Sequence, residues 1–132
     1  MNDKVFSLSM AVRDYECDLQ GVVNNAVYQN YLEHARHEFL KAHGIHFADL
    51  ARQGINLVVV RAELDYRGSL VSGDCFRVST ALRRDSRLKF VFSQEIRHDN
   101  SGRIAVAALI TGVAVNARGR PFLLPEIDNL LK

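Results

Sequence analysis

The residues best suited to chemistry lie within residues 12–28, where the carboxylate of Asp18 precedes the start of a predicted helix. Asp18 lies three residues before Gly21, and the pair Asn24-Asn25 then opens a long amphipathic segment. A helix N-terminus carries partial positive charge and unpaired amide N–H groups, which can hold an oxyanion. A carboxylate beside such an end can act as a general base or as a nucleophile. This stretch therefore predicts attack on a carbonyl carbon.

The helix that follows is the most strongly patterned segment of the chain. Over residues 25–43, apolar side chains recur at spacings of three and four, as on one face of an α-helix: Tyr28, Tyr31, Leu32, Ala35, Phe39 and Ala42. Asn24 or Asn25 is suited to the N-cap and Gly44 to the C-cap. A shorter helix is predicted over about residues 46–53. The long helix thus begins directly after the loop that carries the carboxylate.

Period-two alternation predicts strands on both sides of these helices. Residues 5–14 form the expected first strand, and four more follow the short helix, at about 58–67, 76–83, 88–97 and 103–116. The last of them is apolar on both faces, as expected for a central strand or one near a subunit interface. A turn at 118–121 and a short helix over 125–131 complete the chain.

This order of elements predicts an α+β fold, with one long helix beside an antiparallel sheet. The chain has 132 residues, of which 48% are hydrophobic and 24% charged, so we expect residues 1–132 to form one domain with a real core. A small sheet with long strands leaves edges that need cover. Pairing of such edges between copies of the chain is therefore expected.

Composition also excludes several classes of partner. The 17 basic and 15 acidic residues give a net charge of only +2, which offers no case for nucleic-acid binding. The longest apolar stretch, 104–115, is too short to span a membrane, and no signal peptide is visible. Cys17 and Cys75 are expected to be free thiols, which fits a cytoplasmic protein. A reactive thiol at Cys17, next to the carboxylate, is the less favoured alternative.

A sequence signature across the loop and the helix resembles a known family. Residues 15–28 read Tyr-Glu-Cys-Asp-Leu-Gln-Gly-Val-Val-Asn-Asn-Ala-Val-Tyr, and Glu-His-Ala-Arg follows at 33–36. This pattern resembles the acyl thioesterases of the 4-hydroxybenzoyl-CoA thioesterase family, above all the branch with bacterial long-chain acyl-CoA and plant acyl-ACP thioesterases. The resemblance extends to the Gly-Arg-Pro…Leu-Pro-Glu ending at 119–126. It implies a hotdog fold, in which an antiparallel sheet of five strands or slightly more wraps a long central helix.

The same resemblance assigns roles to individual residues. It implies that Asp18 is the catalytic carboxylate and that the backbone N–H of Asn25 contributes to the oxyanion hole. It implies substrate contacts from the residues around them: Gly21, Val22, Asn24, Tyr28 and Tyr31. Many family members have histidine where this chain has Val22, so no imidazole assists here. The residues alone leave open whether Asp18 acts as general base or as nucleophile.

Other polar residues near this stretch offer alternatives. Asp14 and Glu16 lie close to Asp18, where like charge can raise the pKa of a carboxyl group, although solvated charges at a strand end are the simpler interpretation. Glu33, on the helix, is the natural substitute if the carboxylate comes from there. His34 and His37 are three residues apart but have no apparent third ligand. Neither a metal nor a cofactor is therefore predicted.

The favoured function is hydrolysis of an acyl-CoA or acyl-ACP thioester, with a fatty acyl group, by a homodimer or homotetramer. A serine-hydrolase interpretation fails because the chain has no Gly-x-Ser-x-Gly motif. Two alternatives remain: an aroyl-CoA thioesterase, and a module of the same fold that binds acyl-CoA without catalysis. The sequence specifies neither the acyl chain length nor the choice between CoA and acyl carrier protein.

Overall fold

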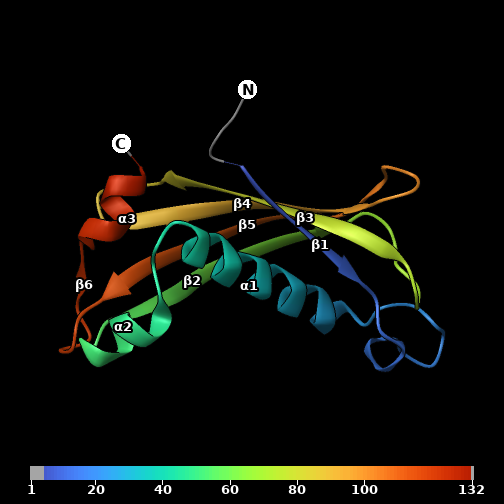
Figure 1. The fold of residues 1–132 in the computed structure, drawn as a ribbon, viewed down its shortest axis with the longest axis horizontal. Coiled ribbons are helices and arrows are strands. Elements are labelled where there is room, and N and C mark those ends of the chain that lie inside the picture. The colour runs from blue at the N-terminus through green and yellow to red at the C-terminus, as the bar shows by residue number, and fades with distance from the viewer. Residues whose placement is uncertain (1–4, 132) are drawn as a thin grey trace.

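The computed structural model describes residues 5–131. Its elements, shown in Figure 1, follow the order β1 (Phe6–Ala11), η1 (Asp14–Glu16), α1 (Asn25–Ala42), α2 (Phe47–Arg52), β2 (Asn56–Tyr66), β3 (Cys75–Arg84), β4 (Lys89–His98), β5 (Ile104–Val115), β6 (Pro121–Phe122) and α3 (Pro125–Leu130). Here η1 is one turn of 3₁₀-helix. The predicted α+β fold and its order of long elements are confirmed.

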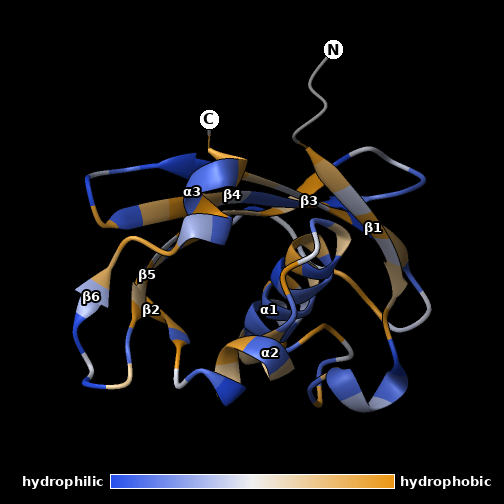
Figure 2. Ribbon diagram, turned by 60° about the vertical axis from the view of Figure 1, so that its left-hand side comes forward, coloured by the Kyte–Doolittle hydropathy of each residue, from blue (hydrophilic) through white to orange (hydrophobic). Residues whose placement is uncertain are grey.

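All strand pairs in the sheet are antiparallel, in the order β1-β3-β4-β5-β2, and β6 pairs with one end of β5. The sheet curves around α1, which lies against its concave face (Figure 2). Because β5 lies between β4 and β2, most of its side chains are buried, as its apolar sequence predicts.

The apolar face of α1 forms the centre of the core. Its buried residues are Tyr28, Tyr31, Leu32, Ala35, Phe39 and Leu40. The helix packs mainly against β3, where the rings of Tyr31 and Phe76 lie 4.7 Å apart. Burying one large apolar side chain contributes about 1.5–3 kcal/mol, so this stripe fixes the position of α1 on the sheet.

A buried polar link sets the same helix in register with the sheet. The amide nitrogen of Gln94, a residue only 1% exposed, donates to the backbone oxygen of Leu32 at 3.0 Å and to the hydroxyl of Thr80 at 2.9 Å. Its amide oxygen accepts a hydrogen bond from Arg36 at 3.1 Å. Since an unmade hydrogen bond in the core is costly, this network favours one axial position of α1 over its neighbours.

Two short features differ from the expectation. The strand predicted over 5–14 ends at Ala11, because the backbone N–H of Arg13 donates to the Glu16 side chain at 2.8 Å and closes the turn η1. Pro121 lies not only at the predicted turn but in β6, paired with Val115. Neither change alters the order of the long elements.

Strand β2 is an outer strand of the sheet and is mostly exposed. Its alternating sequence does not produce a buried face, because α1 packs over β1, β3 and β4, and the register against β5 shifts between Val59 and Arg61. The side chains of Val58, Val59 and Val60 are 38%, 49% and 51% exposed. This strand of eleven residues, with an apolar run at 57–60, thus has one edge that no other strand of residues 5–131 covers.

No helix among the described residues is both long and apolar enough to cross a lipid bilayer.

Candidate active site

The loop between β1 and α1 is a small, closed hairpin rather than an open connection. The N–H of Asp18 donates to the Val22 oxygen at 2.8 Å, and the N–H of Gly21 donates back to the Asp18 oxygen at 3.0 Å. Gly21 has φ of 82°, a conformation that side chains with a Cβ rarely adopt. Glycine at this position therefore allows the chain to reverse three residues after the carboxylate.

The carboxylate of Asp18 is fixed by the same turn. Its Oδ1 accepts hydrogen bonds from the N–H of Gln20 at 2.9 Å and of Val22 at 3.3 Å. Asp18 is exposed, and among residues 5–131 its Oδ2 has no protein hydrogen-bond donor. One oxygen thus anchors the side chain, and the other is available to a water molecule or a substrate.

The N-terminus of α1 has one amide group left for a ligand. Asn24 is the N-cap, and its side-chain oxygen accepts the N–H of Ala26 at 3.0 Å. The N–H of Val27 donates to the Asn24 backbone oxygen at 2.9 Å. Within the described part of the chain the N–H of Asn25 has no acceptor. The first free donor of the helix, where its dipole is strongest, is therefore the one at Asn25.

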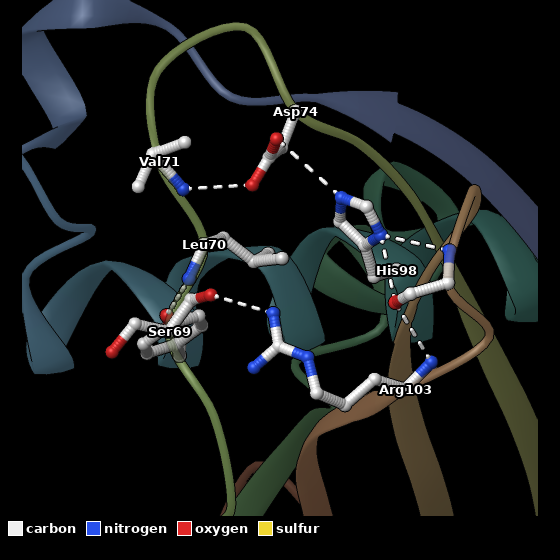
Figure 3. Close-up of polar contacts among 8 residues, drawn as sticks. Ser69, Leu70, Val71, Asp74, His98 and Arg103 are labelled. Carbon is white, nitrogen blue, oxygen red and sulfur yellow. Dashed lines mark hydrogen bonds and ion pairs between the residues drawn. The ribbon is translucent and has the colours of Figure 1, made fainter.

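A segment after β2 forms the opposite wall. The hydroxyl of Tyr28 accepts the N–H of Leu70 at 3.0 Å, and Arg103 donates to the Ser69 oxygen at 3.1 Å. Figure 3 shows this segment held from both sides, with Asp74 bound to the N–H of Val71 at 2.9 Å. Several anchors thus keep the wall beside the helix N-terminus.

Residues at and near the turn between β4 and β5 also brace this wall. The His98 ring lies between the Asp74 carboxylate, 3.4 Å from Nε2, and the Ser101 hydroxyl, 2.9 Å from Nδ1 (Figure 3). Gly68 allows the close approach of Arg103, because a Cβ at Gly68 would collide with the guanidinium group. The side chains of Asp74, His98 and Arg103 thus help to hold the wall in place.

These parts line a cavity of about 640 Å³ that is open to solvent. The loop and the helix contribute Asp18, Gln20, Val22, Val23, Asn24, Asn25 and Tyr28, and the end of β2 with the wall contributes Tyr66, Arg67, Gly68 and Ser69. The structure therefore places Asp18 and Asn25, the residue with the free helix N-terminal amide, on one cavity, and these two groups are of the kind suited to attack on a carbonyl group.

The site residues expected from the sequence lie at different places in the structure. Five of them line the cavity: Asp18, Val22, Asn24, Asn25 and Tyr28. Gly21 shapes the turn behind it. Tyr31 does not line the cavity; it is 2% exposed and its hydroxyl donates to Glu16 at 2.8 Å. Glu33, the alternative carboxylate, lines other cavities two turns further along α1.

The wall residues are the part that sequence reasoning missed. Tyr66, Arg67, Gly68 and Ser69 lie about fifty residues from Asp18 in the chain, and only the break in alternation at Gly68-Ser69 marks them. That break signals the end of a strand. It does not indicate what the following segment faces.

An antiparallel sheet curved around one long helix, with a carboxylate loop at the helix N-terminus, defines a hotdog-fold protein of the thioesterase type. Residues 12–129 match the thioesterase-like superfamily, and the chain belongs to that superfamily. The predicted family resemblance and hotdog fold are thus confirmed.

Individual relatives agree with this assignment. The chain is 42% identical to the acyl-acyl carrier protein thioesterase ATL3 of Arabidopsis thaliana over 90% of its own length, but spans only 63% of that relative. It is 30% identical to the long-chain acyl-CoA thioesterase FadM of Escherichia coli, over 87% of this chain and 86% of the relative. A 1,4-dihydroxy-2-naphthoyl-CoA thioesterase from Synechocystis, 20% identical, shares the fold with a TM-score of 0.89 over 95% and 93% of the two chains.

Proposed function

We propose that the protein is an acyl thioesterase that hydrolyses a fatty acyl-CoA or acyl-ACP thioester to a free acid and a thiol. The observation that carries the proposal is the shared cavity, lined by the Asp18 carboxylate and by the residue with the free helix N-terminal amide, Asn25. Membership of the thioesterase-like superfamily supports the reaction, and the relatives ATL3 and FadM support an acyl group of the fatty type.

In the general-base route, the Asp18 carboxylate removes a proton from water while the water oxygen attacks the thioester carbonyl carbon. The carbonyl oxygen becomes an oxyanion, which accepts a hydrogen bond from the Asn25 N–H. Collapse of the tetrahedral intermediate breaks the C–S bond and releases the thiolate. In the nucleophilic route, Asp18 itself attacks the carbonyl carbon, the C–S bond breaks to release the thiolate, and water later hydrolyses the resulting mixed anhydride to the free acid and the Asp18 carboxylate. Both routes use the same two groups.

In this proposal, the acyl chain lies along α1. Two smaller cavities, of about 250 and 70 Å³, follow the side of the helix that faces β2, and both are lined by Glu33, Arg36 and Val59. From Asn25 to Arg36 the helix rises about 16 Å, at 1.5 Å per residue. A fatty acyl group held at the helix N-terminus can therefore extend towards β2 beside the helix.

A thioester hydrolysis panel tests this function. The substrates are short- to long-chain acyl-CoA, the matching acyl-ACP species and an aroyl-CoA, each followed by thiol release. We expect hydrolysis with the highest kcat/KM on a fatty acyl thioester. Preference for the aroyl substrate would replace the fatty assignment. Tight acyl-CoA binding without hydrolysis of any substrate would instead indicate a binding module.

We propose further that the protein is a homodimer formed by antiparallel pairing of β2 with β2 of a second copy. The supporting observation is the uncovered edge of this strand with its exposed residues Val58–Val60. Long apolar edge strands otherwise promote aggregation, and a two-fold axis lets one edge cover the other. A tetramer built from two such dimers remains compatible with this pairing.

Replacing Val60 by aspartate should convert the dimer to a monomer, because the same charge then enters the interface from both copies. Val60 lines none of the three cavities, so the substitution spares the proposed site. Multi-angle light scattering at micromolar concentration gives the mass. Val5→Asp is the matched control, because Val5 is 42% exposed beside β1, at the other side of the sheet. A monomeric wild-type protein would refute the dimer.

A further inference from the structure

The Glu16 carboxylate lies near the site and accepts two hydrogen bonds, yet Glu16 does not line the cavity. Its side chain is only 10% exposed. Oε1 accepts hydrogen bonds from the hydroxyl of Tyr31 and from the N–H of Arg13, both at 2.8 Å. The Arg13 guanidinium lies 3.8 Å from Oε2. A carboxylate bound in this way is a structural anchor rather than a group free to accept a substrate proton.

The backbone of Glu16 ties the same point to the helix N-terminus. Its carbonyl oxygen accepts the N–H of Asn24, the N-cap, at 3.1 Å. One residue further on, Cys17 pairs with Val23 across the hairpin that holds Asp18. Glu16 therefore joins the strand end, the Asp18 hairpin and the first turns of α1 at a single position.

Tyr31 is the rigid end of this connection. Its ring packs 4.7 Å from Phe76 of β3 and 6.2 Å from Tyr28, so the core fixes its hydroxyl. Burial raises the pKa of the Tyr31 hydroxyl, and the hydrogen bond to Glu16 raises it further. The hydroxyl thus remains protonated, and remains a donor to Glu16, throughout the neutral pH range.

We propose that Glu16 and Tyr31 act as a positioning pair that sets the Asp18 carboxylate relative to the Asn25 amide. The hairpin carrying Asp18 is exposed, and the Glu16–Tyr31 hydrogen bond is the side-chain link described between its base and the interior of α1. The pair contributes through its hydrogen bonds and touches no reacting atom. This inference rests on the proposed thioesterase function.

Tyr31→Phe and Glu16→Ala test the pair in the full-length protein. Each should lower kcat between about 10- and 100-fold with little change in KM, as expected when a catalytic group is displaced by a fraction of an ångström to an ångström. The double variant should be no slower than the slower single one, because both changes break the same link. Tyr31→Phe removes one oxygen atom from a packed ring, so it keeps the test valid if Glu16→Ala folds poorly.

Glu16→Gln is the matched control, since the glutamine oxygen can still accept from Tyr31 and Arg13. We expect it to retain most of the wild-type kcat and an unchanged pH–rate profile. Loss of activity in Glu16→Gln equal to that in Glu16→Ala, with an altered pH profile, would show that Glu16 acts through its charge and would overturn the proposal. Unchanged kcat in Tyr31→Phe would overturn it as well.

Amide hydrogen exchange tests the positioning pair independently of the proposed thioesterase activity. In Tyr31→Phe and Glu16→Ala, exchange across residues 18–24 should accelerate, while β3 and β4 keep their wild-type protection. This result does not depend on any turnover. An inactive wild-type protein with these exchange changes would refute the thioesterase and leave the anchoring pair intact. Unchanged exchange in both variants would refute the pair.

Discussion

The Asp18→Asn variant should lose about three orders of magnitude in kcat for thioester hydrolysis, within the 10²–10⁴ range for a positioned acid or base. Asparagine has nearly the same shape, and its oxygen can still accept from the N–H groups of Gln20 and Val22. The hairpin therefore stays closed while the charge is removed. Asparagine can neither take a proton from water nor form an anhydride with the acyl group, so both routes are blocked.

Asp14→Asn serves as the matched control for this experiment. Asp14 lies four residues earlier, and its carboxylate binds the Ser72 hydroxyl rather than lining the cavity. Steady-state hydrolysis of the best acyl-CoA substrate should be nearly unchanged in this variant, and KM should change little in either. Full activity of Asp18→Asn would show that Asp18 is not the catalytic carboxylate. The alternative would then be Glu33, a carboxylate on α1.

The Asn25→Pro variant should have a kcat lower by about 10²–10³-fold. This is the usual effect of removing one oxyanion-hole donor, which raises the activation barrier by roughly 2.7–4 kcal/mol. The proposed donor is a backbone N–H, which a change of side chain leaves in place. Proline removes that N–H and is well tolerated at the first position of a helix. The preceding residue, Asn24, has φ of −64° and ψ of 139°, an extended conformation that proline favours before it.

Asn25→Ala separates the backbone from the side chain, because alanine keeps the N–H. We expect Asn25→Ala to retain most of its activity and Asn25→Pro to lose it, with similar melting temperatures and circular dichroism spectra for both. Equal loss in both variants would assign the role to the Asn25 side chain. Equal retention would place the oxyanion elsewhere.

The sequence predicted those structural features of the candidate site that are local in the chain. Asp18, Gly21 and Asn24-Asn25 lie within eight residues, and turn and capping preferences act over such distances. The long helix was also predictable, because its apolar residues repeat at helical spacing. These features depend on short-range geometry, which a single sequence expresses directly.

The remaining parts depend on contacts between distant residues. The Glu16–Tyr31 hydrogen bond spans fifteen residues, and the bond from Leu70 to Tyr28 spans forty-two. The exposure of β2 follows from where α1 packs and from a register shift, neither of which appears in the alternation of Val58 and its neighbours. Periodicity reveals that a strand has two faces, but the tertiary packing decides which of them is covered.

In the proposed mechanism, the valine at position 22 bears on which bond can be broken. Val22 is half-buried and pairs with Val71, so the hairpin carries at this position an apolar side chain that cannot protonate a leaving group. A thiol has a pKa of about 8.5 and departs readily as its anion. An alkoxide, whose parent alcohol is about as weak an acid as water, departs only with a proton. In the mechanism proposed here, the acidity of the leaving group therefore directs the protein to thioesters over oxygen esters of the same acid.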